Sequence, residues 1–314
     1  MIIDVHAHYF PVEYLDRLDL YGGSQVTGLI RKMKLEFRGS SGIDAHLRTM
    51  DRSKVDMQIL SISGQLPYFA KENDAVDAAR FGNDLYASIV RDFPKRFAAF
   101  ACTPLPHAKA AIDETRRALD ELGMVGVTAG TFVLGRTIAD PAFDEFFAEL
   151  NRRKAALFIH PTGGSLGSQL IESTRLAWPV GAPLEDTVCL LQFMQANFPI
   201  RFPDIKIILP HLGGFAPFLA ARLDQLQDHF LPQSAMAPSL QAKYFWFDTV
   251  NANPSALRCA RETLGKDHLL MGTDYPFWRD GAFQLCVDYV GESGLPAGEG
   301  EEILGGNAKR LLRL

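Results

Sequence analysis

Short apolar runs alternate with longer amphipathic stretches along nearly the whole chain. The runs are rich in β-branched and aromatic residues and have the length of strands. Eight of them are expected, at residues 2–7, 55–62, 97–102, 124–129, 156–160, 205–210, 244–249 and 268–273. The stretches between them carry apolar residues at helical spacing, most clearly at 73–92, 107–122 and 142–152. Strands that alternate with helices predict a parallel sheet, and eight such units predict a (β/α)8, or TIM, barrel.

Two segments interrupt this alternation, and each follows the carboxyl end of an expected strand. Residues 9–43 are polar and glycine-rich with the pattern of a short hairpin, and residues 161–185 begin with PTGGSLG. Long loops at this end of a barrel commonly form the substrate pocket and its lid. We therefore expect a single α/β domain over residues 1–314, a distorted barrel with insertions after strands 1 and 5, in which residues 9–43 form a lid.

Composition and charge narrow the function classes. The 314 residues suit one barrel with insertions, since such barrels take about 250 residues. The formal net charge of −5 comes without a basic block, so the electrostatic surface that nucleic acids require is missing. No apolar run approaches the roughly 20 residues that cross a bilayer, and the first residues lack the pattern of a signal peptide. We expect a cytoplasmic protein with neither a nucleic-acid nor a membrane partner.

The cysteines fit the same compartment. They are scattered and form no CxxC pair, and they are Cys102, Cys189, Cys259 and Cys286. We expect reduced thiols that pack as small apolar groups, rather than a disulfide framework or a cysteine metal site.

Candidate chemistry gathers at the carboxyl ends of the expected strands. Four of the eight histidines and one aspartate stand there: His6, His8, His160, His211 and Asp274. Strand residues two apart face the same way, about 6.6 Å apart, so the first two histidines can aim at one point inside the barrel. Imidazole and carboxylate are ligands of zinc and related divalent ions, and an open coordination position is typical of a catalytic site.

A single histidine at a strand end more often satisfies loose backbone groups than binds a metal. The other four histidines argue against that alternative here, because they lie at helix ends or at the amino end of the last strand. They are His46, His107, His229 and His268, and we expect them to be structural or solvated. The shared location of the first set favours a metal site.

The roles follow from the chemistry of each group. His6, His8 and His160 are expected as the primary ligands, since neutral imidazole binds zinc without costly deprotonation. Asp274 would complete the shell or hydrogen-bond the ion's water, and it would also carry protons. His211 is expected as an acid or base beside that water, with a further ligand as the alternative. The stretch GVTAGTF offers no bridging carboxylate or lysine, so we expect one divalent ion, zinc with manganese as the alternative.

Five motifs carry a family resemblance. DVHAHYFP, FIHP, PHLGG followed by FAPF, GTDYPF and GNAKRLL resemble the amidohydrolase superfamily, and in detail its decarboxylase branch, which includes the aminocarboxymuconate semialdehyde decarboxylases. The resemblance covers nearly the whole chain, but residues 11–43 and 162–176 differ from those decarboxylases. It implies that His6, His8, His160 and Asp274 bind the metal ion and that His211 transfers a proton. These assignments agree with those made from the strand ends.

The resemblance also implies substrate-binding residues and an assembly. It points to Arg48, to Arg222, which is delivered to the neighbouring subunit's site, and to Trp178 as a pocket aromatic. It thereby implies a homodimer or a higher homo-oligomer. On the residues alone, both arginines would be assigned to solvated helix faces and Trp178 to packing. An arginine fork does suit a carboxylate substrate, because it binds both oxygens at once.

Two activities and one inactive alternative remain open. The resemblance implies a metal-dependent, non-oxidative decarboxylase of an unsaturated or hydroxy-aromatic carboxylic acid, with a small carboxylate as partner. The same ligand set serves a metal-dependent hydrolase of a lactone, ester or amide. A metal-stabilised binding protein without turnover is the third alternative, and an open coordination position beside a spare acid or base argues against it.

Overall fold

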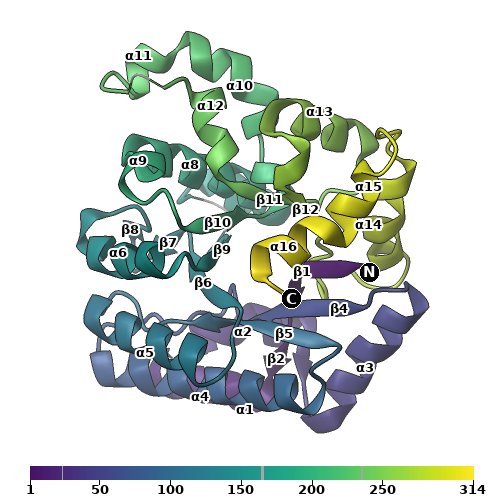
Figure 1. Cartoon of the computed structure of the whole chain (residues 1–314). Helices are drawn as coiled ribbons and strands as arrows, with labels where there is room; N and C mark the ends of the chain where they lie inside the picture. Colours follow the sequence, from purple (N-terminus) through teal and green to yellow (C-terminus); the bar gives the residue numbers. More distant parts are fainter. Residues whose placement is uncertain (23, 164–165, 235) are drawn as a thin grey trace.

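Eight parallel strands form the centre of the computed structural model, which describes residues 1–22, 24–163, 166–234 and 236–314 (Figure 1). In sheet order they are β1 (Ile3–His8), β4 (Met57–Ser61), β5 (Phe97–Cys102), β6 (Gly126–Gly130), β9 (Ala156–His160), β10 (Lys206–Leu209), β11 (Trp246–Asp248) and β12 (Leu269–Leu270). Every expected strand is present within a few residues of its predicted bounds.

The first and last strands meet, so the sheet curls into a nearly closed barrel. Val5 donates its backbone N–H to the carbonyl of Met271 at 2.9 Å. Further along, the N–H of His8 bonds to the carbonyl of Tyr275 at 2.6 Å, and the N–H of Asp274 bonds to the carbonyl of His6 at 2.7 Å. These bonds tie the two histidine positions of β1 directly to the segment that carries the aspartate. The predicted TIM-barrel fold is confirmed.

Helices cover the outside of the barrel, and the three that were predicted are present. They are α4 (Glu72–Asp92), α5 (Ala108–Asp120) and α6 (Asp144–Arg153), the last preceded by the 3-10 turn Pro141–Phe143. Five more helices of similar length lie outside the first insertion: α3 (Gly39–Arg52), α8 (Ala182–Gln195), α10 (Ala216–Gln225), α13 (Pro254–Leu264) and α14 (Gly281–Glu292). In the part of the chain that the structure describes, no helix combines the length and apolar character needed to traverse a lipid bilayer.

Shorter elements decorate the connections. The helices are α7 (Gln169–Ser173), α9 (Phe198–Arg201), α11 (Gln227–Phe230), α12 (Pro238–Gln241), α15 (Glu299–Glu301) and α16 (Asn307–Leu312). An antiparallel pair, β7 (Phe132–Val133) and β8 (Arg136–Thr137), follows β6. Single 3-10 turns span His211–Gly213, Ala242–Tyr244 and Lys266–His268, and π-helical turns span Ala177–Gly181 and Glu302–Gly306.

The first insertion is mainly helical, which the sequence pattern did not predict. It comprises β2 (Phe10–Pro11), α1 (Val12–Gly22), α2 (Ser24–Met33) and β3 (Glu36–Phe37). The two short strands pair in parallel, so the expected hairpin is wrong. A helix forms here because α1 places four buried side chains on one face, at Val12, Tyr14, Leu15 and Leu18. Burial of this face outweighs the low helix propensity of the neighbouring glycines.

The interior of the barrel is apolar at its amino end. Alternate strand residues form one buried cluster with two residues of α16: Ile3, Val5, Met57, Ile59, Ala98, Phe100, Ala156, Phe158, Ile208, Leu270, Ala308 and Leu312. The register of β1 against β4 shifts between Asp4 and Ala7. This bulge allows Val5 to join the interior cluster while the adjacent His6 ring also contacts Phe158, at 4.9 Å between centroids. The predicted metal ligands of β1 therefore lie directly above an apolar layer.

Candidate metal centre

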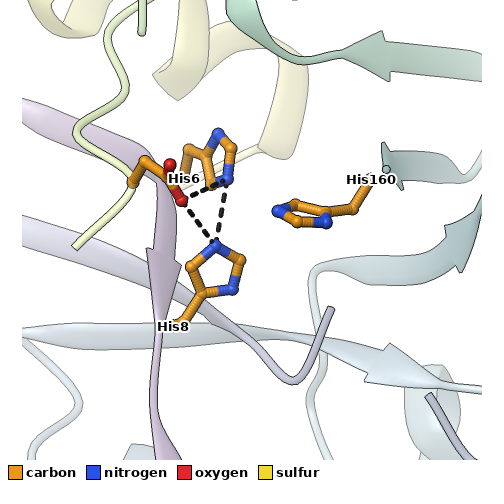
Figure 2. Close-up of side chains that lie close together, drawn as sticks. His6, His8 and His160 are labelled. Carbon is orange, nitrogen blue, oxygen red and sulfur yellow. Dashed lines mark hydrogen bonds and ion pairs between the residues drawn. The ribbon is translucent and has the colours of Figure 1, made fainter. Parts of the chain in front are cut away.

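Three histidines and an aspartate converge at the carboxyl end of the barrel. The Nε2 atoms of His6 and His8 are 3.1 Å apart, and Asp274 Oδ1 lies 3.3 Å from the first and 3.0 Å from the second. Figure 2 shows His160 facing this pair from a different strand. One ligand atom from each of the four residues lies within 4.8 Å of all the others. The structure thus brings together side chains from β1, β9 and the segment after β12.

The Nδ1 atom of each of the three histidines has a polar partner that orients the ring. His6 Nδ1 bonds to Asp248 Oδ2 at 2.7 Å, and His160 Nδ1 bonds to the carbonyl of Pro161 at 2.8 Å. His8 Nδ1 lies 3.3 Å from the hydroxyl oxygen of Ser63. When the Nδ1 atoms donate these bonds, all three Nε2 lone pairs point at the same space. Lone pairs and a carboxylate this close repel one another unless a cation lies between them, so the donor set fits a divalent ion.

Burial and charge set the protonation of these groups. Burial alone would lower the pKa of His6, but the carboxylates of Asp248 and Asp274 raise it to about 9. Burial would raise the pKa of Asp274, but His6 and His211 hold it well below its usual range. Burial, together with His8 and His6, keeps the pKa of His160 well below its usual range. His160 is therefore neutral beside an ionised carboxylate, and the carboxylates that attract a proton to His6 would attract a divalent ion in its place.

His211 lies beside the four candidate ligands rather than among them. Its Nδ1 bonds to Asp186 Oδ2 at 2.8 Å, and its backbone N–H bonds to Asp248 Oδ1 at 2.9 Å. Its Nε2 is 3.9 Å from Asp274 Oδ2. Burial disfavours the charged ring, but the two carboxylates of Asp186 and Asp274 raise the pKa of His211 well above its usual range. The ring is fixed by one carboxylate and free to carry a proton towards the other.

The backbone at this end of the barrel is held in the left-handed region at several non-glycine residues. The φ angles are +53° at His211, +57° at Leu212 and +58° at Asp274. Gly214 follows with a φ of +65°, and a Cβ there would lie 1.9 Å from the carbonyl oxygen of Pro183. Such angles cost free energy and gather at functional sites, where the surrounding structure enforces them. Here they turn the chain sharply after β10 and β12.

A cavity of about 560 Å³ opens onto the centre. His160, His211 and Asp274 line it from the barrel, and three large aromatic residues line it from the loops: Trp178, Phe277 and Trp278. The rings of Trp178 and Phe277 meet edge to face at 5.4 Å between centroids. The volume and the apolar walls suit a small aromatic ligand.

The two insertions contribute to this cavity. Leu29 and Ile30 of α2 line it, as do Pro161, Thr162 and Trp178 of the second insertion. The first insertion therefore reaches the pocket wall through these two residues of α2, and the movement of residues 9–43 as a lid stays a prediction.

The predicted arginines lie away from this cavity. Arg48, on α3, is exposed and lines a separate cavity together with Arg52 and Tyr275. Arg222, on α10, is exposed and lines neither cavity. The structure therefore brings six of the eight predicted site residues together and leaves these two outside. Their contact with substrate stays a prediction.

Three residues that position the site were missed from the sequence. Asp248 binds both His6 and the backbone of His211, and Asp186 and Ser63 orient one histidine each. Asp248 ends the seventh strand, in YFWFDT, so the reasoning that found Asp274 could also have found it. Asp186 lies within α8 and follows no strand, so no sequence pattern marked it.

The fold and the site define the class of protein. The amidohydrolase family model matches residues 3–314, and the chain belongs to this family. This confirms the resemblance drawn from the five motifs.

The relatives narrow the class to decarboxylases. The chain is 29% identical over 332 residues to a 2-amino-3-carboxymuconate-6-semialdehyde decarboxylase of Dictyostelium discoideum, a match that covers 99% of this chain and 91% of that protein. It is 31% identical over 287 residues to a 6-methylsalicylic acid decarboxylase of Penicillium expansum, covering 87% and 84% of the two chains. The predicted decarboxylase branch is confirmed by these relatives, which are carboxy-lyases.

A solved structure agrees with the fold. A dihydroxybenzoic acid decarboxylase from Polaromonas, with bound manganese and the inhibitor 2-nitroresorcinol, superimposes with a TM-score of 0.82 at 23% identity, over 100% of this chain and 97% of that one. The amidohydrolase fold and the four-residue donor set together imply a divalent metal in this chain as well.

Proposed function

We propose that this protein is a metal-dependent, non-oxidative decarboxylase of a hydroxy-aromatic or unsaturated carboxylic acid. The observation that carries the proposal is the cavity of about 560 Å³, in which aromatic walls face the metal ligands and His211. Relatives that decarboxylate 6-methylsalicylic acid and an aminocarboxymuconate semialdehyde support this substrate class.

His6, His8, His160 and Asp274 would hold one divalent ion. When bound, such an ion supplies a Lewis acid that orients and polarises substrate oxygens. Three imidazoles and one carboxylate suit zinc best, so we propose zinc, with manganese as the alternative. Elemental analysis of purified protein checks both the identity of the metal and its ratio of about one per chain.

The side chains around the ion would then transfer a proton to the substrate. His211, fixed by Asp186, delivers a proton to the carbon that bears the carboxylate, with Asp274 as the alternative carrier. The bond between that carbon and the carboxylate breaks, its electron pair returns to the substrate, and carbon dioxide leaves. One proton is consumed and one C–H bond formed, so no oxidant is required. Trp178 and Phe277 would hold the ring plane and exclude water.

The experiment is incubation of the metal-loaded protein with hydroxybenzoates, aminocarboxymuconate semialdehyde and lactones, with carbon dioxide and ring-opened acid measured in parallel. The expected result is carbon dioxide release from a carboxylate substrate. Opening of a lactone without gas would contradict the proposal and favour the metal-dependent hydrolase instead.

The role of His211 is tested by His211→Ala. We expect the variant to keep its metal and to lose about 10²- to 10⁴-fold in kcat, as removal of a general acid does. His229→Gln, at an exposed position, serves as the control. Loss of the metal from the His211 variant would make this residue a ligand rather than a proton carrier.

We further propose a homodimer or higher oligomer in which Arg222 reaches the neighbouring subunit's pocket and binds a substrate carboxylate. The same helix, α10, exposes 84% of the large apolar side chain of Phe218, which supports a contact face there. Mixing inactive Arg222→Met and His211→Ala subunits should restore part of the activity, since some mixed pairs hold one intact site. No recovery, or a fully active monomer by light scattering, would contradict the shared site.

The proposed location is the cytoplasm. The free thiols of Cys102, Cys189, Cys259 and Cys286 support a reducing compartment.

A further inference from the structure

A second cavity, of about 540 Å³, lies between α3 and the segment that follows β12. Its walls carry three arginines from two distant parts of the chain: Arg48 and Arg52 on α3, and Arg279 near α14. The first two are four residues apart, so they project from the same face of the helix. The resemblance to the decarboxylases implies a substrate contact for Arg48 alone among these three, and the proposed reaction uses neither Arg52 nor Arg279.

The three arginines have no carboxylate partner within 4.0 Å among the described residues. Elsewhere the arginines of this chain are commonly paired, as Arg117 is with Glu114 and Asp84. Two aspartates also line the cavity, but Asp51 is already bound by Arg96 at 2.8 Å. Asp280 is then the one remaining acidic group on the described walls. The cavity keeps an excess of positive charge.

Like charges gathered in one concavity repel one another and attract an anion. A guanidinium binds carboxylate or phosphate oxygens through parallel hydrogen bonds, and its fork is rigid. Thr49, which is 7% exposed, places its hydroxyl on the same wall, where it accepts a bond from Arg52 Nη2 at 3.5 Å. We propose that this cavity is a second binding site, distinct from the metal centre, for a small anion with a carboxylate or phosphate group.

The second cavity shares a chain segment with the metal cavity. Residues 274–280 form one short segment that serves both cavities. Asp274, Phe277 and Trp278 line the metal cavity, whereas Tyr275 and Arg279 line the second one. The second cavity and the metal cavity therefore share this segment as part of their walls.

The test is titration calorimetry of the metal-loaded protein with inorganic phosphate and, separately, with malonate. The test variant is Arg52→Gln with Arg279→Gln, and Arg91→Gln, an exposed arginine at the end of α4, is the matched control. We expect binding to the wild type and the control, and at least about tenfold weaker binding to the double variant, because each lost fork removes charge-assisted bonds. Thermal unfolding without added anion checks that the double variant is folded.

The outcomes separate this site from the metal centre. Equal affinity in the wild type and the double variant would overturn the proposal, because the anion would then bind elsewhere, as at the metal. Equal weakening in Arg91→Gln would also overturn it, since general surface charge would explain the binding. Preference for phosphate or for malonate identifies which chemistry the site takes. Failure of the decarboxylation assay leaves these binding results unchanged, so the two proposals fail independently.

Discussion

The two ends of the barrel are built on opposite principles. At the amino end, alternate strand residues such as Phe100 and Leu270 pack with Ala308 and Leu312 of α16 into an apolar plug. At the carboxyl end, the same strands present buried imidazoles and carboxylates on a backbone with several positive φ angles. The first arrangement stabilises the fold through burial of apolar surface. The second costs free energy unless a ligand compensates the buried charges.

This division separates stability from chemistry along one axis. Substitutions at the plug should change the free energy of unfolding and leave the metal in place, whereas substitutions at the ligands should do the reverse. The apolar plug and the candidate metal centre are in direct contact, because Phe158 belongs to the plug and also contacts His6. Variants on either side of this ring are the sharpest way to test the division.

The largest expected effect is that of His160→Ala. It removes one of the four proposed ligand atoms, and we expect the metal content to fall sharply and kcat/KM to fall by roughly a thousandfold or more, since the ion would supply several kcal/mol of stabilisation. Elemental analysis and the decarboxylation assay measure both, with His229→Gln as the control. A His160 variant that keeps full activity would remove the metal centre from the mechanism.

The matching change in the plug is Phe100→Ala. Phe100 is fully buried and stacks on Phe158 at 5.4 Å between centroids. We expect a loss of about 3–5 kcal/mol in the free energy of unfolding, because the ring leaves a cavity in a packed interior. Urea unfolding measures the loss, and metal content at low temperature should remain that of the wild type. Loss of metal without loss of stability would break the division between the two ends.

A third effect concerns pH and a buried histidine outside the barrel. His46 is fully buried on α3 and bonds to Gln58 at 2.9 Å, and burial lowers its pKa from 6.5 to about 4. The unfolded chain therefore takes up a proton at higher pH than the folded one. The contribution of neutral His46 to the free energy of unfolding is therefore complete above pH 6.5. It is lost as the pH falls towards 4, by roughly 3 kcal/mol.

Urea unfolding between pH 7 and pH 4 measures this loss. His46→Gln should flatten the dependence although it lowers stability at neutral pH, whereas His229→Gln should leave the slope unchanged. An unaltered slope in the His46 variant would assign the acid sensitivity to other groups, such as those at the carboxyl end.

The smallest expected effect is that of Asp248→Asn. This carboxylate orients His6 from behind, so we expect metal affinity to fall by about 10- to 100-fold while the fold persists. Competition with a metal-binding dye measures the affinity. Glu149→Gln, which removes a carboxylate paired with arginines far from the centre, should leave the affinity unchanged.

Much of the fold and the donor set was predictable, because both follow from short patterns of apolar and polar residues along the chain. The strand at Phe97–Cys102 matched its expected bounds, since a short buried run has little freedom to be anything else. His8, His160 and Asp274 could be chosen because a parallel barrel brings the ends of its strands to one rim. The helices of residues 9–43 were missed, because their stability comes from packing against the barrel rather than from local propensity.

The sequence by itself determined the order of the eight strands, the family, and which residue types end the strands. Only the tertiary structure decided which side chains meet. It brought Asp248 and Asp186 behind the two histidines that they hold, and it turned Arg48 into a different cavity. The physical reason is the distance along the chain between the residues in contact. Periodicity reports the contacts of residues a few positions apart, whereas a buried carboxylate and its imidazole here are joined across 242 positions of chain.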